Sequence, residues 1–326
     1  MLYPLKFTPQ LKPRIWGGSR LHSLYGKVFP MGGSKCGESW EISGVEGSLS
    51  VVSNGFLAGN NIQELIEVYM GDLVGENNYQ KYGVEFPLLI KFIDTSDYLS
   101  IQVHPDDDMA RRLHHAFGKS EMWYVISGSS ESQIITGLNP KITREQYIEL
   151  LTKGNLAQHL KYEPAQPDDF FYIPSRHLHA LGKDLLLVEI QQTSDITYRV
   201  YDWNRVDENG RGRELHTELA LKAIDFDANP IKRDSIQLVQ NQVQELNNSP
   251  YFVVNRLYLN KKTERSFIET DTFRIYICME GEAFVIGDGF EAVEITAGEV
   301  VLVPASISEV DINPKSTTKI LEVFVK

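Results

Sequence analysis

Three short segments between residues 100 and 182 carry side chains that could bind a metal ion. The run Ser100-Ile-Gln-Val-His-Pro-Asp-Asp places Gln102 and His104 two positions apart. Residues two apart on a strand point to the same face, so Ser100, Gln102 and His104 are predicted to point together into the fold. An inward-pointing glutamine needs a polar partner, and a metal ion would be one.

The other two segments add a carboxylate and two histidines. A predicted strand begins at Gly118-Lys-Ser-Glu-Met-Trp-Tyr, with Glu121 near the start of that strand. His177 and His179 lie in the third segment, Pro174-Ser-Arg-His-Leu-His-Ala-Leu-Gly. Imidazole together with carboxylate suits Zn²⁺, with a position left open for water or substrate. Mg²⁺ would rarely recruit two histidines. His177 and His179 would share a face, so their spacing does not choose between them. Five further histidines are interpreted as solvated: His22, His114, His115, His159 and His216.

A polar run follows, Glu189-Ile-Gln-Gln-Thr-Ser-Asp-Ile-Thr-Tyr-Arg-Val-Tyr-Asp-Trp-Asn-Arg. Its acidic and basic members after the first strand are Asp195, Arg199, Asp202 and Arg205. One interpretation is a solvated ion-pair network. The other is a clamp for a phosphate and an enediolate, because arginine recognises oxyanions through a planar pair of donors. The residues alone leave both open.

The elements that must position these side chains are mostly short strands with frequent Gly, Pro, Asn and Asp breaks, which predicts a sandwich or barrel. Predicted strands are Leu88–Phe92, Leu99–Val103, Met122–Ile126, Phe170–Ile173, Leu185–Gln191, Tyr251–Leu259, Phe273–Met279, Ala283–Ile286, Glu299–Val303 and Lys319–Val325. Helical spacing appears over Asn61–Tyr69 and Thr143–Leu160. The second of these helices opens on a capping box formed by Thr143 and Gln146.

A weak internal repeat divides the chain. Phe170-Phe-Tyr-Ile-Pro-Ser-Arg-His resembles Glu299-Val-Val-Leu-Val-Pro-Ala-Ser, and each follows a strand–Gly–strand run. This pattern predicts a mainly β fold with two cupin-like jelly-roll barrels and a few helices. We expect a zinc-binding catalytic domain with helical segments at residues 1–235 and a metal-free, cupin-like domain at 236–326. The polar segment Ile231–Pro250 is interpreted as the connection. The second copy has no histidine, so Pro250–Lys326 is expected to be structural.

Composition bounds the class of protein. A chain of 326 residues is longer than a single hydrophobic core usually supports, which favours about two domains. The net charge of −12 argues against a nucleic-acid surface but allows local cations to attract an anionic small molecule. No apolar run approaches the roughly 20 residues that span a bilayer, and no secretory signal is visible. The two distant cysteines, Cys36 and Cys278, fit a reduced cytoplasmic compartment.

The motifs quoted above resemble those of type I mannose-6-phosphate isomerases, in particular the short bacterial form. Lys12-Pro-Arg-Ile-Trp-Gly-Gly and Gly37-Glu-Ser-Trp-Glu-Ile-Ser also match, so the resemblance covers nearly the whole chain. It implies one Zn²⁺ per chain, and its ligands would be Gln102, His104, Glu121 and His179. It also implies that Arg199 is the active-site arginine. The polar and basic pocket residues of the family would be Lys91, Ser100, Lys119 and Arg205, although the longer eukaryotic forms have a lysine near the last position.

The resemblance implies that the substrate is a sugar phosphate. Mannose 6-phosphate and fructose 6-phosphate would interconvert through an enediolate, with Zn²⁺ and Arg199 stabilising the developing oxyanion. The base that moves the proton stays open among Glu189, a histidine and a metal-bound hydroxide. Two rival interpretations are a cupin metalloenzyme of another class, such as an iron dioxygenase, and a non-catalytic sugar-phosphate-binding cupin.

Overall fold

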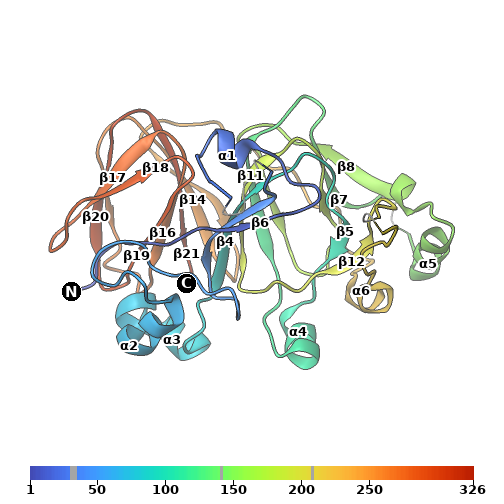
Figure 1. Ribbon diagram of the computed structural model, residues 1–326, viewed down its shortest axis with the longest axis horizontal. Coiled ribbons are helices and arrows are strands. Elements are labelled where there is room, and N and C mark those ends of the chain that lie inside the picture. The colour runs from blue at the N-terminus through green and yellow to red at the C-terminus, as the bar shows by residue number, and fades with distance from the viewer. Residues whose placement is uncertain (30–34, 140–141, 207–208) are drawn as a thin grey trace.

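The computed structural model describes residues 1–29, 35–139, 142–206 and 209–326. The chain is built mainly from β-strands, as predicted, and its strands form two groups that lie side by side (Figure 1). We call β2–β12 the first half, and β1 together with β13–β21 the second half. None of the helices in these residues is long and apolar enough to cross a membrane.

The first half combines a large sheet with smaller ones. The large sheet has the order β2 (Gln10–Lys12), β3 (Glu38–Ser43), β4 (Leu88–Asp94), β11 (Leu186–Gln192), β6 (Glu121–Ser127) and β9 (Phe170–Ile173). The smaller sheets have the orders β10 (Ala180–Leu181), β7 (Gln133–Leu138), β8 (Leu160–Pro164), and β12 (Tyr198–Tyr201), β5 (Ile101–Val103). A bridge between Gln102 and His179 joins the two smaller sheets into one wall.

The second half repeats this plan. Its large sheet has the order β1 (Leu5–Lys6), β19 (Val300–Val303), β16 (Arg274–Glu280), β21 (Thr318–Phe324), β14 (Val253–Leu259) and β13 (Val243–Asn248). Its smaller sheet has the order β15 (Thr263–Ser266), β20 (Glu309–Pro314), β17 (Glu282–Ile286) and β18 (Val293–Thr296). The strands β4 to β11 and β14 to β21 follow one another in the same order and pair with equivalent neighbours, so the internal repeat is real.

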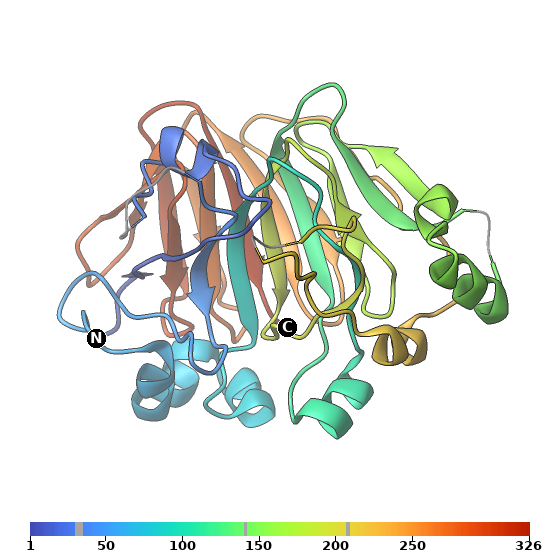
Figure 2. The same ribbon diagram turned by 45° about the vertical axis from the view of Figure 1, so that its right-hand side comes forward.

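The two large sheets pack against each other through one apolar core (Figure 2). Alternation along each strand sets this up, because side chains of successive residues point to opposite faces. On β11, Val188 and Ile190 belong to the shared core, whereas Glu189 and Gln191 point into the first half. On β21, Leu321 and Val323 belong to the shared core. Each strand therefore buries one face centrally and offers the other to the interior of its own half.

Helices occupy the edges of the sheets (Figure 1). They are α1 (Arg20–Ser23), α2 (Ile62–Val74), α3 (Glu76–Tyr82), α4 (Asp107–His114), α5 (Arg144–Thr152), the 3₁₀ turn η1 (Leu156–His159) and α6 (Thr217–Ala223). Both predicted helices exist, and each begins with a capping box. Asn61 caps α2, and Thr143 caps α5 as the sequence predicted.

Two local predictions were wrong. The helix expected over Thr143–Leu160 ends at Thr152, because a turn at Gly154 with φ of 70° breaks it before η1. The segment Ile231–Pro250 is more than a connection, since β13 within it pairs along the edge of the second large sheet. Its polar composition reflects that edge position, where half of a strand's surface faces solvent.

Candidate metal centre

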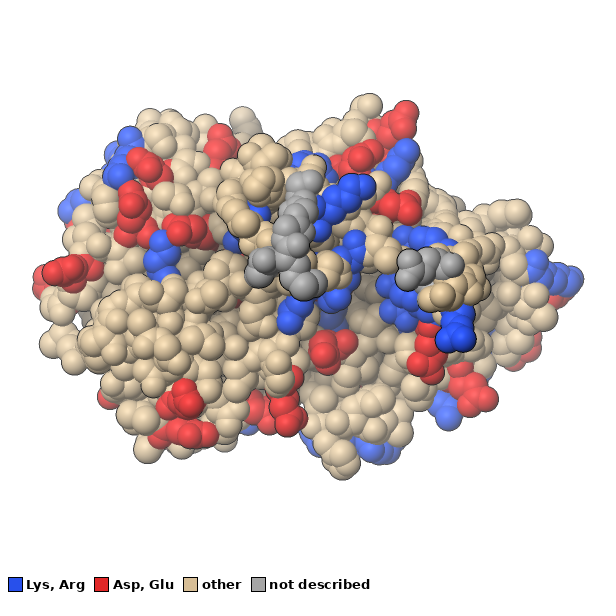
Figure 3. Space-filling view, in the orientation of Figure 1, with Lys and Arg blue, Asp and Glu red and all other residues tan. Residues whose placement is uncertain are grey.

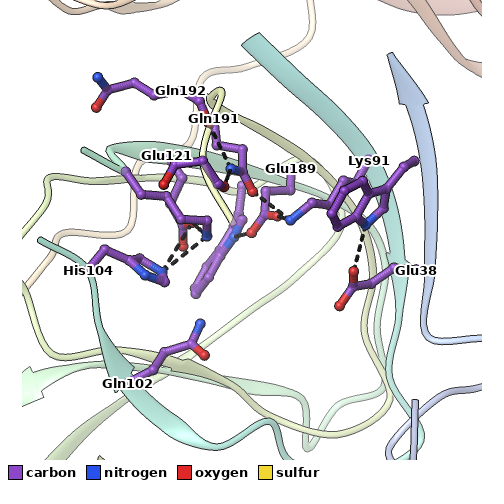
Figure 4. Close-up of polar contacts among 12 residues, drawn as sticks. Glu38, Lys91, Gln102, His104, Glu121, Glu189, Gln191 and Gln192 are labelled. Carbon is purple, nitrogen blue, oxygen red and sulfur yellow. Dashed lines mark hydrogen bonds and ion pairs between the residues drawn. The ribbon is translucent and has the colours of Figure 1, made fainter. Parts of the chain in front are cut away.

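His104, Glu121 and His179 form a buried cluster whose nitrogen and carboxylate atoms lie within 4.8 Å of one another. In the part of the chain that the structure describes, no other group of three His, Cys, Asp or Glu side chains meets this arrangement. The two Nε2 atoms are 3.2 Å apart, and His179 Nε2 lies 3.2 Å from Glu121 Oε1. Gln102 joins them, with its amide nitrogen 3.3 Å from His179 Nε2. Figure 4 shows Gln102, His104 and Glu121 pointing toward a common centre.

Strand geometry explains this convergence. Gln102 and His104 are two residues apart along β5 and its continuation, and Glu121 is the first residue of β6 on the facing sheet. His179 comes just before β10 and is fixed by its bridge to Gln102. The sequence had placed His177 and His179 together on one strand. The structure instead puts His177 beside a separate small cavity, with Nδ1 3.4 Å from the Ser175 carbonyl.

Hydrogen bonds fix the tautomer of both clustered histidines. Nδ1 of His104 lies 2.9 Å from the Ile196 carbonyl oxygen, and Nδ1 of His179 lies 2.9 Å from that of His177. A carbonyl oxygen only accepts, so each Nδ1 carries the proton and each Nε2 presents a lone pair. This is the outer-shell arrangement that commonly orients metal-bound histidines.

The spacing of the converging atoms fits a tetrahedral ion. Metal–ligand bonds of about 2.0–2.1 Å separate tetrahedral ligand atoms by roughly 3.4 Å. The contacts among His104, Glu121 and His179 range from 3.2 to 3.5 Å. Two lone pairs that face each other without a proton repel, and Glu121 Oε1 is buried without a hydrogen-bond donor. A cation bound among these atoms would satisfy all of them.

The ammonium of Lys119 adds a positive charge beside this cluster. It donates to Glu121 Oε2 and lies 3.1 Å from His104 Nε2. Burial and then Lys119 hold the pKa of His104 well below its usual value, which keeps the imidazole neutral. Burial opposes ionisation of Glu121, but the ammonium of Lys119 outweighs it and lowers that pKa well below its usual value. A neutral imidazole and an ionised carboxylate are the forms that bind metal ions.

A second buried polar network lies on the adjacent strands. Lys91 Nζ donates to Glu189 Oε2 at 2.6 Å and to Gln191 Oε1 at 2.5 Å (Figure 4). Trp123 donates its indole proton to Glu189 Oε1 at 2.9 Å. These partners satisfy both carboxylate oxygens of Glu189. The pattern follows from register, because Glu189 pairs with Lys91 on one side and Trp123 on the other.

Both networks border a cavity of about 390 Å³. Five cations and three carboxylates line it, and among the cations only Arg199 has no ion pair with the described residues. The cations are Arg14, Lys91, Lys119, Arg199 and Arg213, and the carboxylates are Glu38, Glu189 and Asp195. Figure 3 shows Lys and Arg side chains gathered near the middle of one face, next to a hollow. Ser100 and Gln102 also line this cavity, as their predicted orientation requires.

The arginines of the polar run have different surroundings. Arg205 and Arg213 both pair with Asp202, at 2.5 and 2.6 Å, and Arg205 also donates to the Tyr98 carbonyl. Arg199 donates to the Glu214 carbonyl at 2.8 Å, and its Nε has no partner. Burial and the nearby Arg213 lower the pKa of Arg199. Arg199 lines the cavity, whereas Arg205 does not, because Asp202 and Tyr98 hold its guanidinium elsewhere.

Some residues of the site were missed. Arg14 forms a bidentate pair with Glu38, and Trp40 donates to the same carboxylate. The sequence motifs that contain Arg14 and Glu38 had both been noted. The alternation of Glu38 and Trp40 along β3 could have indicated that these two side chains share a face. Arg213 had no such signal, because only the fold brings it back to Asp202. His216 was interpreted as solvated, but it is half-buried and its Nδ1 accepts from the backbone nitrogen of Arg199.

Comparison with known proteins gives concordant matches. Residues 4–133 match the model of the phosphomannose isomerase type I catalytic domain. A mannose-6-phosphate isomerase of Streptococcus mutans is 34% identical over 311 residues, which cover 94% of each chain. One from Bacillus subtilis is 34% identical over 313 residues, again 94% of each chain. The crystal structure of the mannose 6-phosphate isomerase from Bacillus subtilis superposes with a TM-score of 0.86 at 29% identity, covering 99% of both chains.

Proposed function

Because this chain belongs to the type I phosphomannose isomerase family and is therefore an isomerase, we propose that it interconverts mannose 6-phosphate and fructose 6-phosphate with the help of one bound Zn²⁺. The observation that carries this proposal is the buried cluster of His104, Glu121 and His179 beside a cation-lined cavity. In the isomerisation of a sugar phosphate, a metal ion at the cluster would stabilise charge on the reacting oxygens, and cations in the cavity would hold the phosphate.

The proposed ligands are Gln102, His104, Glu121 and His179. The orphaned Glu121 oxygen and the two facing lone pairs support this set. Nitrogen and oxygen donors at tetrahedral spacing favour Zn²⁺ over Mg²⁺. When bound, Zn²⁺ would act as a Lewis acid that stabilises negative charge on a substrate oxygen. Binding would also release Lys119 from Glu121, so its ammonium could turn to the substrate in the cavity that it lines.

The proton transfer from C2 to C1 needs a base on the cavity wall. Both clustered histidines use Nδ1 for a backbone carbonyl and direct Nε2 to the proposed metal position, so neither has a nitrogen free. Glu189 lines the cavity, with its carboxylate held between Lys91 and Trp123. We therefore propose that Glu189 takes the C2 proton from the open-chain aldose and returns it to C1.

The cations distribute over the two ends of the substrate. Arg199 has no carboxylate partner among the described residues, and its Nε is free, so it is suited to the negative charge of the enediolate. Lys91 and Ser100 would hold hydroxyl groups. The arginines at the rim, Arg14 and Arg213, are suited to the phosphate, whose binding energy would orient the reacting end. We propose that Arg205 acts indirectly, by fixing Asp202 and through it Arg213.

Two further proposals concern the division into domains and the cellular location of the protein. We propose a division into a catalytic domain at 1–235 and a cupin-like domain at 236–326, with β1 of the N-terminal segment added to the second sheet. We also propose a cytoplasmic location and no nucleic-acid partner. Both cysteines are buried and free, and the chain is acidic.

The test is a coupled assay that converts mannose 6-phosphate to fructose 6-phosphate under air and under nitrogen. We expect turnover in both, with loss of activity in Glu189→Gln while zinc content is kept. Turnover that needs oxygen would support a dioxygenase instead. Tight binding of mannose 6-phosphate without turnover, in zinc-loaded protein, would support a binding protein.

A further inference from the structure

The second half contains a cavity of about 420 Å³ at the mouth of its own pair of sheets. Its charged lining residues are Arg265, Arg274, Glu269 and Glu322, and Asn255, Phe267 and Phe324 line it as well. The sequence suggested a purely structural role for this half. A cavity with two arginines is not needed for packing, so its position relative to the repeat is informative.

Register places Glu322 at the position that Glu189 occupies in the first half. On β11, Glu189 pairs with Lys91 of β4 and Trp123 of β6. On β21, Glu322 pairs with Asn255 of β14 and Tyr276 of β16. The strands are equivalent in order and partners, so these are the same three positions of the repeat.

The hydrogen bonds at these positions are also the same. Trp123 donates to one oxygen of Glu189, and Lys91 donates to the other. Tyr276 donates to Glu322 Oε2 at 3.0 Å, and Asn255 donates to Glu322 Oε1 at 3.0 Å. A carboxylate held between an aromatic donor and a side-chain N–H has thus been kept in a half that carries no histidine.

The position of Glu121 is taken by Arg274. Glu121 lies two residues before Trp123 and pairs with Ile173 on β9, which is followed by Pro174. Arg274 lies two residues before Tyr276 and pairs with Val303 on β19, which is followed by Pro304. The second half therefore presents a cation where the first half presents a carboxylate to the proposed metal.

The facing wall has changed in the same direction. In the first half, Gln102 bridges to His179. On the corresponding strands β15 and β20, Arg265 pairs with Val310. Glu121 thus has an arginine at its equivalent position, and a second arginine lies on the strand that corresponds to β5. Among the described residues of this half, no group of three His, Cys, Asp or Glu side chains is placed to hold a metal ion.

The charge of Arg274 is not neutralised within the described residues. Arg265 forms a bidentate pair with Glu322, at 2.7 and 2.8 Å, so those two charges cancel. Arg274 is only 3% exposed and has no ion pair. Its Nη1 donates to the carbonyls of Thr272 and Phe273, its Nη2 to the Thr270 hydroxyl, and its Nε has no partner.

Aromatic rings hold this guanidinium in place. Its central carbon lies 4.4 Å from the ring centre of Phe267 and 4.0 Å from that of Phe324. Such stacking fixes the plane of the guanidinium. Arg265 binds Glu322 through the edge formed by its Nε and Nη2. In Arg274 the Nη2 of this edge donates to Thr270, and its buried Nε has no partner among the described residues, so Nε is the donor left for an oxyanion.

We propose that this cavity binds a small oxyanion, of the kind carried by a phosphate ester or a carboxylate, through Arg274. It lies in the second half at the position that the proposed metal centre has in the first half, with Arg274 in place of Glu121. It is separate from the isomerase cavity, and the proposal does not depend on the isomerase activity.

The test uses crystals of the full-length, zinc-loaded protein soaked in sodium selenate, whose anomalous signal locates the oxyanion. We expect a peak at hydrogen-bond distance from Arg274 Nε. A parallel soak in sodium acetate shows whether a carboxylate occupies the same position. Peaks at the cavity beside Arg199 serve as the internal control. Selenate at that control position and none beside Arg274 would overturn the proposal.

Solution binding supplies a second readout with variants that keep the fold. Ile268 lines the cavity and is 71% exposed, so Ile268→Glu adds a negative charge with little cost to packing. Ile268→Gln is the matched neutral control. Calorimetric titration with inorganic phosphate should resolve one site that Ile268→Glu and Arg274→Gln weaken about tenfold or more. Isomerase activity should be unchanged in both Ile268 variants. Equal phosphate binding in Ile268→Glu and Ile268→Gln would contradict the proposal.

Discussion

Replacing Arg199 by alanine should slow turnover far more than it weakens substrate binding. Arg199 lies on β12, and its backbone is fixed by His216 on both sides, through its nitrogen at 3.1 Å and its carbonyl at 2.8 Å. One guanidinium nitrogen is committed to the Glu214 carbonyl, and Nε has no partner. The free donors are therefore held in place before the enediolate forms.

The size of the effect follows from these free donors. Loss of one preorganised oxyanion donor costs about 10²–10³ in kcat, or roughly 2.7–4 kcal/mol. No carboxylate among the described residues pairs with Arg199, so its removal leaves no buried charge behind and the loss should appear in catalysis. Arg199→Ala should lower kcat by about that factor, and Arg199→Lys should recover only part because it lacks the planar fork.

Steady-state kinetics with mannose 6-phosphate, together with zinc analysis, make the measurement. Arg111→Ala is the matched control, because Arg111 is 73% exposed on α4 and outside the cavity. Zinc content should be equal in all of these proteins. A large rise in KM with unchanged kcat would refute the reasoning, because Arg199 would then bind substrate and transition state alike.

Three further outcomes are expected. His179→Ala should remove most bound zinc, whereas His177→Ala should keep it, as measured by elemental analysis; the reverse result would exclude the proposed ligand set. Lys91→Met should lower the free energy of unfolding by about 3–5 kcal/mol, as measured by denaturant titration, because it leaves the buried carboxylate of Glu189 without its cation. The double variant Lys91→Met, Glu189→Gln should recover part of this loss, and no recovery would show that the two side chains are not coupled. Burial opposes ionisation of Glu38, but the neighbouring cations Lys91 and Arg14 lower its pKa below the ordinary 4.5. The stabilising contribution of its carboxylate is therefore present above pH 4.5 and disappears as the pH falls through the lower, folded-state pKa. Glu38→Gln should make the free energy of unfolding less dependent on pH in the acid range, and an unchanged dependence would contradict this assignment.

Local patterns in the sequence were enough to predict the mainly β fold and most strands. Alternation along β5 predicted that Gln102 and His104 share a face, because strand side chains have a period of two. The capping box at Thr143 predicted the start of α5. The end of that helix was missed, since a single glycine turn decides it.

Contacts between distant segments could not be read from the sequence. The choice between His177 and His179 depends on the bridge from His179 to Gln102, which joins residues 77 positions apart. The role of Arg213 depends on a loop that returns to Asp202. The arginine pocket of the second half was also missed, because the search for histidines treated their absence as an absence of function.

A zinc ion held by the buried cluster should be required for isomerisation, and adding metal back to stripped protein tests this. Protein is stripped with a chelator, its zinc content is measured, and turnover of mannose 6-phosphate is followed as Zn²⁺ is added back. We expect negligible activity without metal and full recovery at about one zinc per chain, with no recovery in Glu121→Gln. Undiminished turnover by fully metal-free protein would contradict it.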